Sequence, residues 1–270
     1  MAGKNGRIAG IFYYPVKSCR GIATSSVEIR ERGIKSDRNW VVASAEGKAL
    51  TQREFSQMAL IEAIVDDGGI LTLKAPERDP CTVAQGNGSS PTTVDVWGNQ
   101  CAGVDEGDDV ANWLGSYLGT QCRLVQVAKD NDRKCMAPLP DGSSVKLTFV
   151  DGCSLLVISQ ESLDDLNNRL SEPVTMKRFR PNIVIEGIGA YLEDDCTELK
   201  IGDLTLYKVQ PCERCVITTI DPESATKSVE PLKTLSSYRR VEKKVNFGAY
   251  YLHSQPGKIS VGDEVIASLD

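Results

Sequence analysis

The sequence contains a single histidine, His253, among its 270 residues. One imidazole nearly excludes a Ser-His-Asp triad, an iron site with two histidine ligands and a His-rich zinc site. His253 stands near the end of a C-terminal strand, where we expect a surface or packing residue rather than a catalyst. Any catalysis by this chain must therefore proceed mainly without imidazole.

Long apolar runs are also missing. No stretch approaches the ~18 consecutive apolar residues that a membrane-spanning helix requires, and residues 1–7 lack the apolar core of a signal peptide. We therefore expect no transmembrane segment and a cytoplasmic location. The formal net charge of -6 argues against a nucleic acid polymer as partner, so an anion site would need a local cluster of basic residues.

The composition, 41% hydrophobic and 25% charged, suits one large or two small cores. The nine cysteines are odd in number and no secretory signal accompanies them. This pattern indicates reduced thiols rather than a disulfide framework. Only Cys212 and Cys215 have a spacing typical of a metal or redox site.

Short strands separated by turn residues predict a β-rich, mixed α+β fold with a small barrel or curled sheet. Three helices are expected at residues 108–118 with Asp105 as N-cap, from Ser159 to about residue 170, and at residues 231–238. Residues 84–93 (AQGNGSSPTT) are predicted to form a loop.

The stretch VQPCERCVI (residues 209–217) places Arg214 between Cys212 and Cys215, on a predicted loop between two strands. A neighbouring cation favours the thiolate of Cys215, which would be a nucleophile or a soft-metal ligand. Three other interpretations stay open: a redox dithiol without a thioredoxin-like context, half of a zinc site without its second half, and two buried thiols that pack as small hydrophobes.

Basic and polar residues follow apolar strands at four places, namely Lys17-Ser18, Arg38, residues 178–182 (RFRPN) and Arg214-Cys215. Arginine pairs can hold a phosphate through several donors, and lysine adds a point charge. Taken singly, each of these basic residues has a simpler interpretation, because Arg and Lys side chains are usually solvated at the surface. Taken together with one thiolate, they would suit an anionic, phosphate-bearing cofactor whose metal is soft, although spacing alone does not establish that they converge.

Several motifs, in order, resemble a known family. YPVKSCRG (residues 14–21) with DRNW (37–40) is similar to the MOSC N-terminal β-barrel domain. FRPNIV (179–184), CERC (212–215) and PLKTLSSYR (231–239) are similar to the MOSC domain proper. The whole resembles the amidoxime-reducing components, including plant and algal members. This resemblance implies a β-barrel-like domain over residues 1–125 and a MOSC β-barrel domain with a few helices over residues 126–270, with early strands contributing to one site.

The resemblance also implies a molybdenum–molybdopterin cofactor whose metal is bound by Cys215, which makes Cys215 the catalytic residue and metal ligand. The positions that match the family's pterin and phosphate contacts are Lys17, Ser18, Arg38, Arg180, Asn182 and Arg214. Asp151, Gly152 and Cys153 match a loop at the cofactor. Gly152 and Cys153 stand where relatives often carry hydroxyl groups, which leaves backbone donors there. Asp151 is a candidate proton relay.

The implied reaction is the two-electron reduction of N-hydroxylated compounds, such as amidoximes, hydroxamic acids and N-hydroxylated bases, with nitrite reduction to nitric oxide as a further activity. Electrons would come from NADH through cytochrome b5 reductase and cytochrome b5, since the chain carries neither a membrane anchor nor a ferredoxin domain. Mitochondrial association follows from the same resemblance. The alternative is a carrier or sulfuration module that binds the cofactor without turnover. The lack of a pyridoxal-phosphate domain and the presence of Cys215 favour the enzyme.

Overall fold

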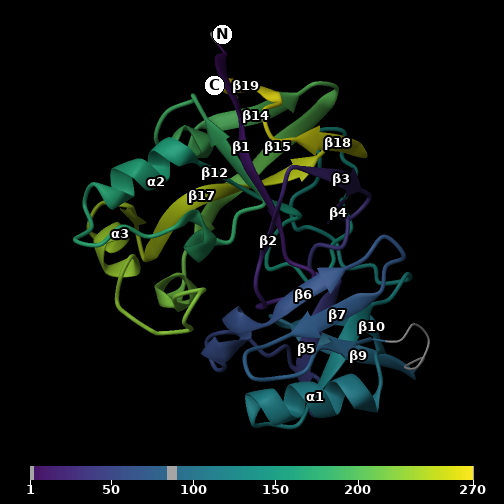
Figure 1. Cartoon of the computed structure of the whole chain (residues 1–270). Coiled ribbons are helices and arrows are strands. Elements are labelled where there is room, and N and C mark those ends of the chain that lie inside the picture. The colour runs from purple at the N-terminus through teal and green to yellow at the C-terminus, as the bar shows by residue number, and fades with distance from the viewer. Residues whose placement is uncertain (1–2, 84–89, 270) are drawn as a thin grey trace.

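The computed structural model describes residues 3–83 and 90–269. In Figure 1 the chain forms an upper lobe, where both termini lie, and a lower lobe that ends in the helix α1 (Asp108–Leu118). Residues 84–89 of the predicted loop lie outside the described residues. The prediction is wrong for residues 90–93, because they belong to strand β9 (Ser90–Val96) and pair with β10 (Asn99–Asp105).

The upper lobe is built around a closed ring of seven strands, in which each strand pairs with the next and β12 pairs with β17 to complete the circle. In ring order they are β12 (Leu155–Ser159), β13 (Ile183–Glu186), β1 (Lys4–Tyr13), β19 (Glu264–Leu269), β14 (Cys196–Ile201), β15 (Leu204–Glu213) and β17 (Lys244–His253). The short strands β2 (Ile22–Thr24) and β16 (Arg240–Val241) extend this sheet. Alternate residues such as Val157, Ile185 and Leu206 fill the centre of the barrel with apolar side chains.

The lower lobe contains two further sheets and α1, which pack on a second apolar core around Trp40, Leu73 and Leu114. Its four-stranded sheet runs in the order β5 (Trp40–Ser44), β11 (Cys122–Val127), β10 and β9, and its three-stranded sheet in the order β6 (Glu62–Val65), β7 (Leu71–Lys74) and β8 (Cys81–Thr82). The 3-10 helix η1 (Ser56–Leu60) precedes β6. A third small sheet, β18 (Gly257–Ser260), β3 (Ser26–Arg30) and β4 (Gly33–Ile34), joins early strands to a late one.

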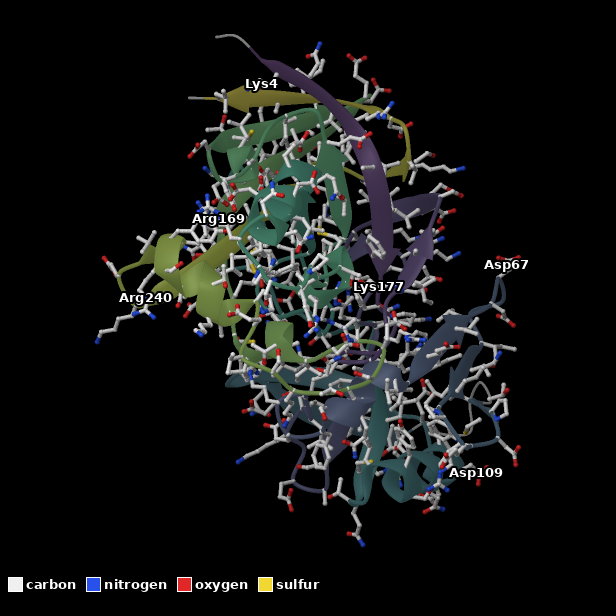
Figure 2. All side chains as sticks on the ribbon, turned by 60° about the vertical axis from the view of Figure 1, so that its left-hand side comes forward. Lys4, Asp67, Asp109, Arg169, Lys177 and Arg240 are labelled. Atoms are coloured by element: carbon white, nitrogen blue, oxygen red, sulfur yellow. The ribbon has the colours of Figure 1, made fainter. Side chains whose placement is uncertain are left out.

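The predicted β-rich, mixed α+β fold is confirmed, with two β-rich parts and few helices. β1 stands first in the chain yet pairs with β13 and β19 in the upper barrel. The division near residue 125 stays a prediction. The charged side chains labelled in Figure 2 include Asp67, Asp109 and Arg240, which project from the margins of the molecule.

The helix predictions are confirmed in place, with one wrong cap. α1 matches residues 108–118, but its N-cap is Gly107, because Asp105 is the last residue of β10. There its carboxylate is bound by Arg123 through Nε and Nη2, each at 2.6 Å, and accepts the Gly107 N–H at 2.8 Å. α2 (Gln160–Asn167) begins after Ser159, whose hydroxyl accepts the backbone N–H of Ser162, and ends before residue 170. α3 (Leu232–Tyr238) follows Pro231.

A buried acid lies near α2. Glu193, in the 3-10 helix η3 (Leu192–Asp194), is fully buried, and the Ser162 hydroxyl donates to its carboxylate at 2.9 Å. Burial raises the pKa of Glu193 to about 7, and the neighbouring charge of Asp194 acts in the same direction. Charging this side chain at high pH therefore opposes folding.

Candidate functional site

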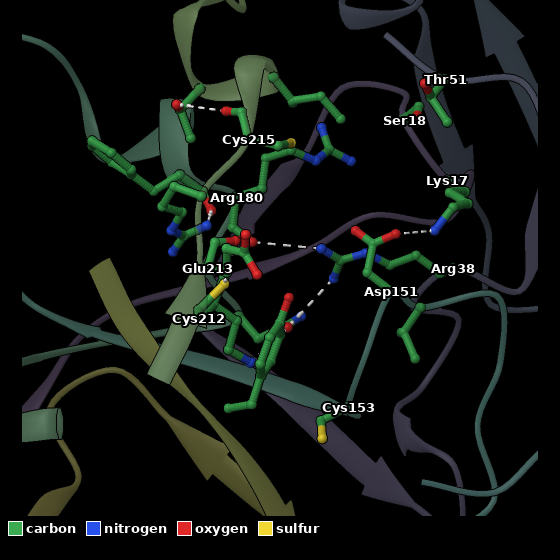
Figure 3. A pocket seen from close by; sticks show the side chains of 18 of the residues that line it. Lys17, Ser18, Arg38, Thr51, Asp151, Cys153, Arg180, Cys212, Glu213 and Cys215 are labelled. Carbon is green, nitrogen blue, oxygen red and sulfur yellow. Dashed lines mark hydrogen bonds and ion pairs between the residues drawn. The ribbon is translucent and has the colours of Figure 1, made fainter. Parts of the chain in front are cut away.

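One cavity collects nearly all of the predicted site residues. Its empty space is about 780 Å³ when the part open to solvent is included, and it receives side chains from both lobes. The predicted residues that line it are Lys17, Ser18, Arg38, Asp151, Cys153, Arg180, Asn182, Arg214 and Cys215. Figure 3 labels most of these side chains, among them Lys17, Arg38, Arg180 and Cys215, around the pocket. Gly152 is the predicted residue that does not line the cavity.

The backbone is strained where it presents three of these residues. Ser18, Arg38 and Arg180 have φ values of 66°, 49° and 53°. These values lie in the left-handed region that residues other than glycine rarely adopt. Arg180 ends the 3-10 helix η2 (Met176–Phe179) in this conformation. Such strain persists only where the surrounding structure holds it, and it gathers at functional sites.

Tyr14 holds two of the arginines in place. Its ring centroid lies 4.1 Å from the Arg38 guanidinium and 4.2 Å from that of Arg180, within cation–π distance. The Tyr14 hydroxyl donates to the Pro181 carbonyl at 3.0 Å, and Arg180 Nη1 donates to the Cys19 carbonyl at 2.7 Å. The ring therefore fixes the spacing of two cations that would repel each other without it.

Asn182 and Arg38 use much of their bonding capacity inside the protein. The Asn182 carbonyl oxygen of the side chain accepts the Leu156 N–H at 3.1 Å, and its amide donates to the Phe12 carbonyl at 3.3 Å. Arg38 Nη1 donates to both carboxylate oxygens of Asp37, at 2.8 and 2.6 Å. Asn182 thus braces β12 against the end of β1, and Arg38 is partly neutralised.

Two other arginines keep an unused donor facing the interior. Arg214 donates through Nε to the Phe247 carbonyl at 2.7 Å and through Nη1 to the Phe179 carbonyl at 2.9 Å, while its buried Nη2 has no partner among the described residues. Arg178 donates to Asp221 at 3.0 Å, and its buried Nη1 is likewise unpaired within residues 3–83 and 90–269. Since unmade hydrogen bonds of buried cations are costly, these two donors are suited to an anionic ligand.

Lys17 and Asp151 form an ion pair on another wall of the cavity. Lys17 Nζ donates to Asp151 Oδ1 at 2.5 Å and to the Phe149 carbonyl at 2.9 Å, and Trp97 Nε1 donates to the same carboxylate at 2.8 Å. Desolvation opposes ionisation of Asp151, but the Lys17 charge and these hydrogen bonds outweigh it and hold the pKa of Asp151 well below its usual range. Burial lowers the pKa of Lys17, against the opposing effect of Asp151.

The cysteine pair divides into two environments. Cys212 is buried in β15, packed with Phe179, Val184 and Phe247, and burial raises its thiol pKa. Cys215 is half-buried, and both cysteines line the cavity. The described residues contain no group of three or more His, Cys, Asp or Glu side chains that could hold a metal. A metal at Cys215 would therefore need further ligands from a cofactor.

The predicted loop around these cysteines is corrected by the structure. β15 continues through Pro211 to Glu213 with an irregular register opposite β17, so Pro211 and Cys212 do not interrupt the strand. The residues expected to start a new strand form the 3-10 helix η4 (Val216–Thr219), because the Cys215 carbonyl accepts the Thr218 N–H at 3.2 Å and its hydroxyl at 3.0 Å.

The loop Asp151-Gly152-Cys153 precedes β12 as predicted. A Cβ added at Gly152 would lie 3.6 Å from the Tyr250 ring, so Gly152 leaves this space clear. Cys153 faces the cavity, and its sulfur lies 2.9 Å from that of Cys135. Residues 128–144 carry Cys135, and their polar composition, rich in Asp, Lys and Pro, predicts a surface loop or lid. The structure differs, because Asn131, Cys135 and Leu139 are buried in this segment.

Sequence reasoning did not assign Thr51, Trp97 and Tyr250 to the cavity that they line. Trp97 stands before Gly98 in the turn between β9 and β10, and an aromatic residue in a turn is a signal that could have marked it. Thr51 and Tyr250 carry no comparable signal. Trp40 and Phe179 are core residues as predicted, and His253 is a buried packing residue.

Comparisons with known proteins agree with the motifs. Residues 5–121 match the MOSC N-terminal beta barrel domain and residues 144–266 match the MOSC domain. The chain is 36% identical to the mitochondrial amidoxime-reducing component 1 of Mus musculus and 37% identical to that of Homo sapiens; each match covers 96% of this chain and 82% of the relative. It is also 34% identical to a molybdenum cofactor sulfurase of Oryza sativa subsp. japonica, over 89% of this chain and 32% of that protein. In the described part of the chain, no helix has the length and apolar character that crossing a membrane demands.

Proposed function

Since this chain belongs to the family of the amidoxime-reducing components, with a MOSC N-terminal beta barrel domain and a MOSC domain, we propose that it is a molybdenum-cofactor-dependent reductase of N-hydroxylated compounds. Its substrates would be amidoximes, hydroxamic acids and N-hydroxylated bases, with nitrite reduction to nitric oxide as a further activity. The observation that carries the proposal is the convergence of the family-matched basic residues and Cys215 on one cavity.

The donor set of the cavity fits a molybdenum–molybdopterin cofactor. Arg178 and Arg214 each keep a buried N–H donor that no described residue pairs with, and the strained backbone at Ser18 and Arg180 directs further polar groups at the same space. Donors of this kind suit a phosphate and a polar pterin ring. The half-buried Cys215 would supply the protein's thiolate to the metal.

The residues that line the cavity would contribute to cofactor binding in different ways. Arg180 and Arg214 would contact the phosphate and pterin directly, together with Lys17 and Ser18. Arg38 and Asn182 would act largely by position, because Asp37 and backbone groups already occupy most of their hydrogen-bonding capacity. Gly152 and Cys153 would contribute backbone and shape rather than side-chain hydroxyl contacts.

The bound cofactor would supply the two electrons that cleave the N–O bond, with two protons consumed and water released. Asp151 is ionised at neutral pH, since its pKa is depressed, and so it holds no proton in reserve. Its carboxylate is mostly exposed, and it touches the buried Lys17 ammonium. We assign Asp151 as the relay between solvent and the Lys17 ammonium, which carries the proton at the cavity wall.

Electrons would come from NADH through cytochrome b5 reductase and cytochrome b5, and mitochondrial association is proposed from the names of the relatives. The test is an assay of the purified, molybdenum-loaded chain with both partners and benzamidoxime. NADH-dependent formation of benzamidine is the expected result. Absence of turnover despite stoichiometric molybdenum would refute the reductase.

The second candidate is a cofactor carrier or sulfuration module. The similarity to the rice molybdenum cofactor sulfurase, of which this chain spans about a third, favours it. A carrier would bind the cofactor and release it to an acceptor protein without reducing benzamidoxime. Metal analysis and the turnover assay on one preparation therefore separate the two candidates.

A further inference from the structure

Two buried cysteines outside the CERC motif lie in direct contact. The sulfur atoms of Cys135 and Cys153 are 2.9 Å apart, whereas a disulfide bond is about 2.05 Å long. Both residues are buried, with relative exposures of 6% and 4%. A shift of each side chain by roughly half an ångström would bring the sulfurs to bonding distance.

The backbone on both sides of this contact is fixed. The Cys135 N–H donates to the Val145 carbonyl at 3.0 Å, and the Leu147 N–H donates to the Arg133 carbonyl at 2.7 Å. The Arg133 guanidinium donates to the Val150 carbonyl at 2.6 Å and to the Asp151 carbonyl at 2.8 Å. Arg133 thus joins the segment that carries Cys135 to the loop that carries Cys153, so the thiols meet without a large movement.

The two thiols differ in chemical character. The hydrogen bond with Cys153 lowers the pKa of Cys135 against the effect of desolvation, and the N–H groups of Ala137 and Met136 and the charge of Arg133 also lower it. The same hydrogen bond and burial raise the pKa of Cys153. One sulfur is therefore the better nucleophile, and the other is a thiol placed to react with it.

A small oxidant has a route to the pair. Cys153 lines the open cavity, and Met136, next to Cys135, is 84% exposed. Because both thiols are buried, a small hydroperoxide reaches them more readily than a bulky disulfide oxidant.

We propose that Cys135 and Cys153 are a reversible oxidation site that forms an intramolecular disulfide on reaction with a hydroperoxide. The Cys135 thiolate attacks the terminal peroxide oxygen, the O–O bond breaks, and Cys135 becomes a sulfenic acid. The Cys153 sulfur then attacks the Cys135 sulfur, the S–O bond breaks, and water leaves. With hydrogen peroxide, two thiols and one peroxide give one disulfide and two waters.

The disulfide would tie the Cys135 segment to the wall of the cavity. Cys153 follows Asp151 by two residues, so the new bond would fix the loop whose carboxylate pairs with Lys17. This inference requires no molybdenum and no turnover, and it can fail while the proposed reductase function stands.

The test uses the reduced full-length chain and hydrogen peroxide, followed by alkylation of free thiols and trypsin digestion without reductant. Lysine and arginine positions place Cys135 in peptide 135–146 and Cys153 in peptide 147–169, each with one cysteine. The expected product is these two peptides joined, with two of the nine thiols lost and recovered by dithiothreitol.

Matched variants identify the pair. Cys135→Ser and Cys153→Ser should each abolish the joined peptide, and Cys81→Ser should leave its yield unchanged. Cys135 recovered as an unpaired sulfinic acid, or either cysteine joined to a different partner, would overturn the proposal. The proposal would also be overturned if, in the wild-type protein, Cys135 and Cys153 were both still alkylated under conditions that had oxidised Cys81 or Cys215. The wild-type digest decides the question even where a variant fails to fold.

Discussion

The ammonium group of Lys17 lies 2.5 Å from the carboxylate of Asp151, and the two residues differ sharply in exposure. The Lys17 side chain is 4% exposed and that of Asp151 is 59% exposed. A nearly buried cation thus depends on a carboxylate that water reaches. Because the exposed partner is screened, the pair is worth less than a fully buried one.

We predict that Asp151→Asn destabilises the protein by about 1 kcal/mol at pH 7, since Lys17 stays buried without its counter-charge. The folded-state pKa of Asp151 is depressed, so its contribution is present above the unfolded pKa of ~3.9 and is lost as pH falls below it. Urea unfolding of both proteins from pH 7 down to pH 3.5 checks this. The stability gap should narrow below about pH 4, and Asp130→Asn is the exposed control. Equal stabilities at pH 7 would refute the dependence of Lys17 on Asp151.

Tyr14→Leu should lower both stability and cofactor content, because Arg38 and Arg180 lose their cation–π contacts with the Tyr14 ring. We expect a loss of about 2–4 kcal/mol in unfolding free energy. Tyr14→Phe keeps the ring, loses the hydrogen bond to Pro181, and should cost about 1 kcal/mol. Urea unfolding and molybdenum analysis of both variants measure the two effects. Full molybdenum content in the leucine variant would contradict a role of the ring in placing the arginines.

Arg214→Gln should weaken cofactor binding by about 10- to 100-fold, the loss expected for hydrogen bonds from a charged donor. The reason is that Arg214 holds a buried donor for which the described part of the chain offers no partner. Molybdenum content and cofactor release on dilution are the measurements. Arg169→Gln, in an exposed pair with Asp165, is the control and should bind normally. Unchanged affinity in the Arg214 variant would remove it from the cofactor site.

Replacement of the two motif cysteines should have different results. Cys215→Ser should abolish benzamidoxime reduction, because a serine hydroxyl is a poor ligand for a soft metal. Cys212→Ser places a hydroxyl in an apolar cluster and should cost about 1–3 kcal/mol of stability while turnover persists. Turnover assays and thermal unfolding separate these effects. Normal reduction by the Cys215 variant would disprove its assignment as metal ligand.

Glu193 should make stability fall as pH rises. Its folded-state pKa of about 7 is above the unfolded value of ~4.3. Between these pH values the folded protein binds more protons than the unfolded one, so the free energy of unfolding falls as pH rises through this range. The loss between pH 5 and pH 8 should amount to up to about 3 kcal/mol. Glu193→Gln should flatten this decline, whereas the exposed Glu264→Gln should not. Urea unfolding at the two pH values gives the slopes, and parallel slopes would rule out Glu193 as the cause.

Local patterns predicted the regular parts of the fold well. The apolar stripe of Val110, Leu114 and Leu118 placed α1 correctly, because a helix with one buried face shows its period in the sequence. The segment around Cys215 was predicted wrongly, since the irregular register of β15 and the short turn of η4 have no periodic signal. The cap at Asp105 failed because Asp105 ends β10, where Arg123, remote in sequence, binds its carboxylate.

Only the site residues that stand in recognisable sequence motifs could be predicted. The basic residues and Cys215 stand in motifs whose order identified a family, and the structure brings them to one cavity. Trp97 enters that cavity from the turn between β9 and β10, whereas Tyr250 reaches it from β17, far along the chain from the basic motifs. Pairing across such distances leaves no mark on neighbouring residues. The contact between Cys135 and Cys153 likewise has no local sequence signal, because it arises where residues 131–153 fold back on themselves through backbone hydrogen bonds.

The pairing of β1 with β19 has a consequence for the order of events during synthesis. Lys4 lies opposite Ala267, so the edge of β1 that pairs with β19 waits until residues 264–269 have been made. At roughly 5–20 residues per second, that delay is on the order of tens of seconds on the ribosome. During this time that part of the β1 edge lacks its partner and is open to wrong ones. Closure of the barrel therefore follows the synthesis of β19, after the other six strands of the ring have been made.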